Sequence, residues 1–239
     1  MADLLRILNI GNTHVQVFDS GGPDLISPAG SCPTSDFDLR QEARFVPALA
    51  VSSVVPAFSA QLREMGAWVI SGAMPLPFAP SGLDLSTVGA DRLANAAALL
   101  SGPLPAISID FGTAITIEFV TKERQFAGGA ILPGRMLLRK ALHDHTAQLP
   151  LIGLSGSVPA LPGRNTVDAM RIGTDRAVLG AVRGLICDWQ ALCAPSPLRI
   201  AACGGDRQFF LDHIGGMDDG GETFTAGGIR KLWDWCHAG

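Results

Sequence analysis

The chain of 239 residues contains no tyrosine, and aromatic residues of all kinds make up only 6% of it. Charged residues are also few, at 17%, and the formal net charge is −4 with no cluster of lysine or arginine. A surface that binds nucleic acid or an anionic membrane needs concentrated positive charge, so the sequence argues against both partners. Hydrophobic residues, in contrast, make up 47%, which is enough for a globular protein with a buried core.

The five cysteines are scattered, without a Cys-x-x-Cys pair or the His/Cys spacing of a zinc site. An odd number of separated thiols predicts reduced cysteines, as in a cytoplasmic protein. No uncharged apolar run reaches the roughly 18 residues that a membrane span needs. The N-terminal residues lead into a strand without the features of a signal peptide, so we expect a cytoplasmic location.

What the sequence does contain is a short motif that occurs twice. Asn9 precedes the turn Gly11-Asn12-Thr13, and Asp110 precedes the turn Gly112-Thr113, each between two apolar strands. Glycine lets the backbone approach an anion closely, and neighbouring N–H groups and side-chain donors can converge on a phosphate. Such turns are also common in ordinary hairpins, so each copy alone is weak evidence. Two copies in one chain predict a duplicated nucleotide-binding fold with a cleft between the halves.

Hydrophobic periodicity and chain breakers predict an α/β protein with mixed sheets. Strands are expected at 4–10, 14–18, 45–55, 68–70, 126–132 and 198–203, with a hairpin at 106–120 and a loop or frayed edge strand at 19–33. Helices are expected at 57–65, 89–100, 135–145, 166–192 and 229–236, and loops at 71–88 and 151–163. A boundary near residue 102 would divide the chain into halves 1–102 and 103–239, each with one copy of the motif.

Together the motifs resemble the type III pantothenate kinases, members of the actin-like and sugar-kinase superfamily. The resemblance runs nearly end to end and is carried in order by Gly11-Asn12-Thr13, Ser52-Ser53-Val54-Val55-Pro56, Gly89-Ala90-Asp91-Arg92, residues 109–114, 128–134, 141–142, 146–150 and 163–166, and Gly204-Gly205. It implies two ribonuclease-H-like halves around an interdomain cleft, with dimerisation helices in the second half. The implied reaction is ATP-dependent phosphorylation of pantothenate to 4′-phosphopantothenate, the first step of coenzyme A biosynthesis.

The resemblance implies that Asp91 is the catalytic base, which accepts the proton of the pantothenate hydroxyl. Gly89, Ala90 and Arg92 would bind pantothenate beside it, and Arg92 would hold its carboxylate. Asn95 lies one turn further along the expected helix and could orient Asp91. From the residues alone, Asp91 could equally be a helix cap and Arg92 part of an ordinary ion pair.

The remaining implied site residues bind the nucleotide, cations and the second subunit. Asn9 and the turns Gly11-Asn12-Thr13 and Gly112-Thr113 would contact the phosphates of ATP with Mg²⁺, and Gly204-Gly205 would face its adenosine. Asp110 would bind a monovalent cation, K⁺ or NH₄⁺. Thr166 would reach the substrate of a neighbouring subunit, which makes the expected active unit a homodimer with shared sites. The residues alone would also allow Thr166 as a helix cap.

Two departures from the family pattern bear on activity. Asn9 stands where the family has an aspartate, and so lacks the negative charge that Mg²⁺ prefers beside phosphate. The stretch before Gly89, about residues 82–85, lacks the family's Tyr-x-Asn-Pro, which contributes to the pantothenate pocket. The leading hypothesis is an active kinase. The alternatives are a pseudo-kinase that binds nucleotide or pantothenate in a regulatory role, and a kinase for a different small alcohol.

Overall fold

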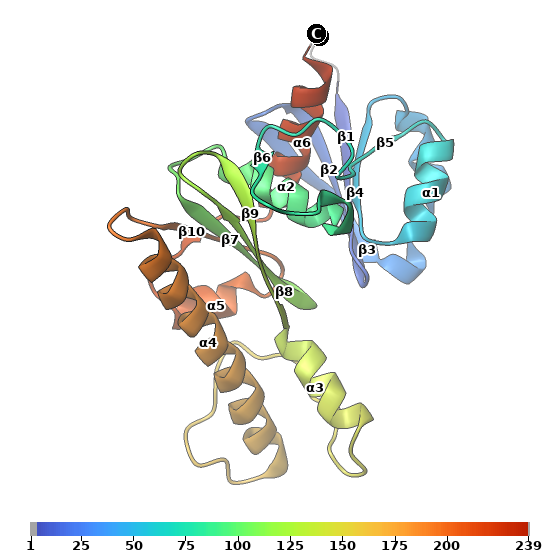
Figure 1. Cartoon of the computed structure of the whole chain (residues 1–239). Helices are drawn as coiled ribbons and strands as arrows, with labels where there is room; N and C mark the ends of the chain where they lie inside the picture. The colour runs from blue at the N-terminus through green and yellow to red at the C-terminus, as the bar shows by residue number, and fades with distance from the viewer. Residues whose placement is uncertain (1–3, 239) are drawn as a thin grey trace.

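The computed structural model describes residues 4–238, which form two β-sheets with helices between and around them (Figure 1). The first sheet has the strand order β3-β2-β1-β4-β5 and the second has the order β11-β10-β7-β8-β9-β6. The first sheet consists of β1 (Leu5–Ile10), β2 (His14–Gly22), β3 (Leu25–Pro33), β4 (Leu49–Ser53) and β5 (Trp68–Val69). The second consists of β6 (Ala79–Pro80), β7 (Ala106–Phe111), β8 (Ala114–Val120), β9 (Gln125–Pro133), β10 (Arg199–Cys203) and β11 (Asp218–Asp219).

The two sheets repeat one topology, which confirms the predicted duplication. In each, three antiparallel strands are joined by tight turns, and two further strands then add in parallel beside the first. The second sheet has one strand more, β6, which pairs in parallel with β9. The equivalence extends to single hydrogen bonds at the turns. The residue after the third strand donates its backbone N–H to the turn in both halves: Thr34 to the carbonyl of Thr13 at 3.0 Å, and Gly134 to that of Thr113 at 2.9 Å.

Six α-helices accompany the sheets among residues 4–238: α1 (Pro56–Glu64), α2 (Ala90–Leu99), α3 (Arg135–Asp144), α4 (Thr166–Cys193), α5 (Arg207–His213) and α6 (Phe224–His237). Most agree with the predicted ranges, but α5 was not predicted and α6 begins five residues before its expected start. The predicted strand at 45–55 is shorter at both ends, since β4 spans only Leu49–Ser53 and follows a 3-10 turn at residues 43–45 and a further turn. No helix within 4–238 is both long and apolar enough to cross a membrane.

Helices α2 and α6 pack against each other between the two sheets (Figure 1). Helix α2 presents mainly alanines, whose small side chains allow a close approach of the second helix. At the crossing, α6 contributes Gly228, where an added Cβ would overlap the backbone carbonyl of Ala94. This pair of helices therefore fixes the spacing between the halves and, with it, the position of the residues at the start of α2.

Helices α3 and α4 extend from the second sheet, and the first turn of α4 lies at the far end of this projection (Figure 1). Arg135 and Arg139 on α3 are almost fully buried and pair with Asp175 of α4 at 2.9 and 2.7 Å. Arg139 also donates to the backbone carbonyl of Gly153. A buried charge is costly without a partner, so these ion pairs hold the two helices in one arrangement.

Candidate active site

The two predicted phosphate turns face each other across the gap between the halves. The hydroxyl oxygens of Thr13 and Thr113 lie 3.0 Å apart, and both residues are exposed. At the second turn, Gly134 packs so closely that an added Cβ would overlap the carbonyl oxygens of Gly112 and Thr113. The structure thus places exposed backbone and hydroxyl groups from both halves around one point.

Asp110 lies at the end of β7, directly before the second turn. Its carboxylate accepts a hydrogen bond from Nδ2 of Asn95 at 3.3 Å. Gly204, with a φ of +89°, passes so close that a Cβ there would overlap the Asp110 carboxylate. Burial raises the pKa of Asp110 to about 6; the Asn95 hydrogen bond opposes this rise, and the nearby charge of Asp91 adds to it. Asp110 is thus a desolvated carboxylate beside the phosphate turn.

Asp91 lies in the first turn of α2, which begins at Ala90 after Gly89. Its carboxylate accepts the backbone N–H of Arg92 at 2.8 Å. Gly89 leaves little room, because an added Cβ would lie 2.7 Å from the Asp91 carboxylate oxygen. Burial raises the pKa of Asp91, and the N–H and charge of Arg92 oppose this rise. A half-buried carboxylate with a raised pKa suits a group that accepts a proton.

The expectation that Asn95 orients Asp91 is wrong. Asn95 is fully buried between α2, β7 and α6, where it donates to Asp110 and accepts a hydrogen bond from the hydroxyl of Thr225 at 2.8 Å. A buried amide needs both kinds of partner, and these two satisfy it. Asn95 therefore links α6 to the Asp110 carboxylate.

Arg92 is held by Glu118, which was not among the predicted site residues. Nε of Arg92 donates to Glu118 at 2.9 Å, and the hydroxyl of Ser108 donates to the other Glu118 oxygen at 3.0 Å. Glu118 is fully buried, and burial raises its pKa to about 7 against the opposing charge of Arg92. The signal was present in the sequence: a single charged residue stands inside the mostly apolar strand 114–120.

Asn9 occupies the position in β1 that corresponds to Asp110 in β7. Its amide nitrogen donates to the side-chain oxygen of Gln16 on β2 at 3.3 Å. An aspartate could not make this bond, because a carboxylate has no N–H donor. The Asn9 oxygen accepts no hydrogen bond from a side chain among residues 4–238, so it is available to a ligand as a neutral oxygen donor.

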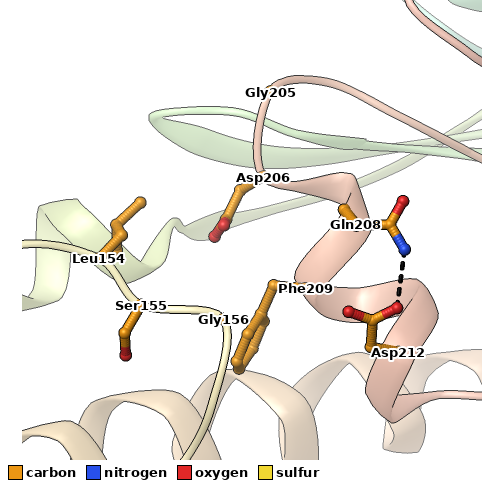
Figure 2. Close-up of a pocket in the computed structure, with 8 residues that line it drawn as sticks. All are labelled: Leu154, Ser155, Gly156, Gly205, Asp206, Gln208, Phe209 and Asp212. Carbon is orange, nitrogen blue, oxygen red and sulfur yellow. Dashed lines mark hydrogen bonds between the residues drawn. The ribbon is translucent and has the colours of Figure 1, made fainter.

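Gly204 and Gly205 follow β10 and lead to a cavity of about 290 Å³ on the second half (Figure 2). Its lining residues come from the segment 154–156, from α5 and from the two residues before that helix: Leu154, Ser155, Gly156, Gly205, Asp206, Gln208, Phe209 and Asp212. The backbone N–H of Asp206 donates to the carbonyl of Phe111 at 2.9 Å, so the cavity adjoins the strand that carries Asp110. Both glycines were predicted site residues, but Asp206, which directly follows them, was not.

Thr166 is not brought to the other candidate residues. It is the first residue of α4, is exposed, and lies at the far end of the α3–α4 projection (Figure 1). The cap of this helix is Asn165, whose side chain accepts the backbone N–H of Asp168 at 2.8 Å. Within a single chain, therefore, Thr166 does not lie near Asp91, Asp110 or the two phosphate turns (Figure 1).

A metal site built only from side chains is not found among residues 4–238, where no three His, Cys, Asp or Glu residues lie close enough together to hold an ion. The carboxylate of Asp110 and the amide oxygen of Asn9 are nevertheless hard oxygen donors at the two turns. Mg²⁺ in phosphate-transferring sites commonly takes one or two protein oxygens and completes its shell with phosphate and water. The donor set fits a cation that arrives with a phosphorylated ligand.

Comparison with known proteins identifies relatives along the whole chain. A model of the type III pantothenate kinase family matches residues 29–188, which include Asp91, Asp110 and Thr166. A type III pantothenate kinase from Geobacillus thermodenitrificans is 32% identical over 97% of each chain. One from Exiguobacterium is 28% identical over 97% of this chain and 98% of that protein.

Solved structures show the same fold at lower sequence identity. A Baf family protein from Campylobacter jejuni superposes with a TM-score of 0.64 at 20% identity, over 97% of this chain and 98% of that one. A ROK family glucokinase from Streptomyces griseus superposes with a TM-score of 0.53 at 10% identity, over 99% of this chain and 100% of that one. The two-lobed architecture is thus the actin-like and sugar-kinase fold.

Proposed function

Because this chain belongs to the type III pantothenate kinase family, we propose that its active site is the cleft where Asp91, Asp110 and the two phosphate turns meet. The reaction of the family is the transfer of a phosphoryl group from ATP to pantothenate, the entry step of coenzyme A biosynthesis, and it is the function of this chain. The observation that carries the proposed site is the 3.0 Å contact between Thr13 and Thr113, which brings both repeats of the motif to one place.

Asp91 is the base in this proposal. Its partly buried carboxylate accepts the proton of the pantothenate hydroxyl as that oxygen attacks the γ-phosphorus of ATP. The bond between the γ-phosphorus and the oxygen bridging to the β-phosphate breaks, and ADP leaves with that oxygen. Burial raises the pKa of Asp91, which makes the carboxylate a better proton acceptor. Arg92 binds Glu118 through Nε, so its two terminal amino groups would be available to the pantothenate carboxylate. Gly89 would give the substrate access to the backbone at the start of α2, whereas the side chain of Ala90 is buried in the core and would not contact it.

The phosphate groups of ATP occupy the space between the turns Gly11-Asn12-Thr13 and Gly112-Thr113. Mg²⁺ bound with ATP neutralises the negative charge of the phosphates. Asn9 and Asp110 are the side chains that would hold cations here, with Asp110 as the ligand of K⁺ or NH₄⁺. The adenosine would lie beyond Gly204-Gly205, in the cavity lined by Asp206, whose backbone N–H donates to the carbonyl of Phe111 at the end of β7.

We also propose a homodimer in which Thr166 completes the site of the partner subunit. The support is its remote position in one chain, together with a concentration of exposed apolar side chains between residues 131 and 161. Six of the ten large exposed hydrophobic residues found within 4–238 fall in this stretch: Ile131, Met136, Leu137, Leu151, Leu154 and Leu161. An exposed apolar surface of this kind is typical of a protein interface.

A pseudo-kinase is the second candidate, and Asn9 favours it. Its hydrogen bond to Gln16 gives Asn9 a structural role that needs no metal ion. If the missing charge removes an interaction worth about 3–4 kcal/mol in the transition state, turnover falls by roughly two to three orders of magnitude. The chain would then bind nucleotide and pantothenate without rapid phosphoryl transfer.

The test is direct detection of 4′-phosphopantothenate from the wild type and Asn9→Asp, with ATP, Mg²⁺ and K⁺. Product from the wild type, raised further in Asn9→Asp, supports a kinase that works without the usual acidic ligand. Product from Asn9→Asp alone supports the pseudo-kinase. Product from neither protein contradicts the proposed substrate and points to another alcohol. Asn9→Gln is the matched control, since it changes side-chain length without adding charge.

A further inference from the structure

Asp206 stands out in the cavity at the start of α5, because it is a carboxylate in a place expected to receive part of a polyanion. Its carboxylate points into the space between α5 and the segment 154–156 (Figure 2). Its side chain is only 20% exposed. An anion so placed would repel phosphate, but it can accept hydrogen bonds from neutral hydroxyl groups.

Arg135 fixes this carboxylate. Its Nη1 donates to both Asp206 oxygens, at 2.9 and 3.2 Å, and neutralises their charge. The rest of the guanidinium is fully engaged: Nε and Nη2 bind Asp175 at 2.9 and 3.2 Å, and Nη2 also donates to the carbonyl of Ser155 at 2.7 Å. Its Cζ lies 3.3 Å from the ring centre of Phe209. Arg135 thus touches three residues that line the cavity and holds their relative positions.

Each carboxylate oxygen of Asp206 has two lone pairs, and Arg135 uses one on each. Acceptor capacity therefore remains on the side that faces the cavity. The other carboxylate there, Asp212, differs because it is exposed to solvent and contacts only Nε2 of Gln208 at 2.7 Å (Figure 2), whereas Asp206 is largely buried and held by Arg135. Asp206 is consequently the lining group best placed to receive an incoming hydroxyl.

We propose that Asp206 accepts a sugar hydroxyl of the bound nucleotide and so selects ribonucleotides over deoxyribonucleotides, with Arg135 as its positioning residue. This inference rests on the proposed function, in which the adenosine of ATP lies in this cavity. It adds the chemical group that is recognised and the side chain that recognises it. A charged acceptor lost from a site that cannot replace it commonly weakens binding about tenfold to a hundredfold.

The experiment compares the binding of ADP, 2′-deoxy-ADP and 3′-deoxy-ADP, each with Mg²⁺, by calorimetry on the full chain. We expect the wild type to bind at least one deoxy form about tenfold more weakly than ADP. Asp206→Asn keeps an oxygen for Arg135 and should reduce this preference to about threefold or less, and Asp206→Ala should remove it. The change should come from weaker ADP binding, with little change for the deoxy form.

Asp219→Asn is the matched control. Asp219 is also paired with an arginine, Arg207 at 2.8 Å, but it does not line the cavity, so its variant should keep the wild-type preference. In the kinase assay, Asp206→Asn should raise KM for ATP and leave KM for pantothenate unchanged. A general disturbance of the structure would move both.

Two results would overturn the inference. The first is equal binding of all three nucleotides to the wild type, which removes the sugar contact but leaves the proposed kinase function intact. The second is an equal loss of affinity for ADP and both deoxy forms in Asp206→Asn, which makes Asp206 merely structural. Absence of any nucleotide binding would contradict the proposed function as well.

Discussion

At the scale of single residues, Asp91 is the group whose chemistry can be tested most directly. Asp91→Asn keeps the size of the side chain but removes the proton acceptor, so kcat should fall by about 10²- to 10⁴-fold. The thermal midpoint should be unchanged or slightly higher, because a partly buried charge is removed. The measurements are steady-state kinetics and thermal unfolding of the same preparation.

The exposed Asp188 of α4 provides the control for that substitution, and Asp188→Asn should leave both quantities unchanged. Wild-type turnover in Asp91→Asn would remove Asp91 as the base. A loss of turnover accompanied by unfolding would instead assign it a structural role at the start of α2.

The buried carboxyl of Glu118 predicts a particular dependence of stability on pH. Its pKa rises from an ordinary value of 4.5 to about 7 in the folded protein, chiefly through burial. The folded state therefore binds this proton more tightly than the unfolded state, and the stability that it contributes is lost as pH rises through this range. Relative to Glu118→Gln, the wild type should lose on the order of 3 kcal/mol of unfolding free energy between pH 4.5 and 8.

Denaturant unfolding of both proteins at four or five pH values measures this difference. A constant difference across the range would contradict the raised pKa of Glu118.

The rate of the reaction should depend on pH in the opposite direction to stability. Asp110, with a pKa of about 6, must lose its proton before it can bind a cation. The rate should thus increase with pH from 5 to 7 while stability decreases.

At the scale of elements, the crossing of α2 and α6 leaves no room for a side chain at Gly228. Gly228→Ala would force a methyl group into the carbonyl of Ala94, and overpacking of this kind costs about 1–3 kcal/mol. Gly184→Ala, on the exposed face of α4 where a Cβ meets open space, is the matched control and should raise stability by about 0.4–1 kcal/mol. Thermal unfolding of the two variants distinguishes them, and equal midpoints would contradict the tight crossing.

Elements also differ in how readily the sequence predicts them. The long helix 166–193, the alanine-rich helix 90–99 and the hairpin 106–120 have strong local patterns, and each was predicted within a residue or two. Helix α5 spans only Arg207–His213, which is too short for a periodic pattern to stand out. It is stabilised by contacts distant in sequence, such as the stacking of Phe210 on Phe111 with ring centres 3.9 Å apart.

At the scale of the whole molecule, the proposed homodimer predicts that assembly and substrate affinity change together. Leu137→Asp places a charge on the exposed apolar stretch 131–161 and should yield monomers with a KM for pantothenate raised about tenfold or more. Thr166→Ala should leave the dimer intact and still raise that KM. Light scattering with size-exclusion chromatography and the kinase assay give both readouts.

Asp24→Asn, at an exposed turn of the first half and remote from α3 and α4, is the control and should behave as the wild type does. A wild-type protein that is a fully active monomer at micromolar concentration would contradict the shared site. Full activity of monomeric Leu137→Asp would do the same.

The sequence by itself determined the repeated hairpins, the α/β class and the family, because each depends on short local patterns in a fixed order. It also supplied Asp91, Asp110 and both turns as candidate residues. Only the tertiary structure decided which groups meet: that Asn95 binds Asp110 rather than Asp91, that Glu118 holds Arg92, and that Arg135 fixes Asp206 from a position 71 residues away in the chain. The physical reason is that hydrogen bonds and ion pairs between distant segments depend on how helices and sheets pack, which no local pattern specifies.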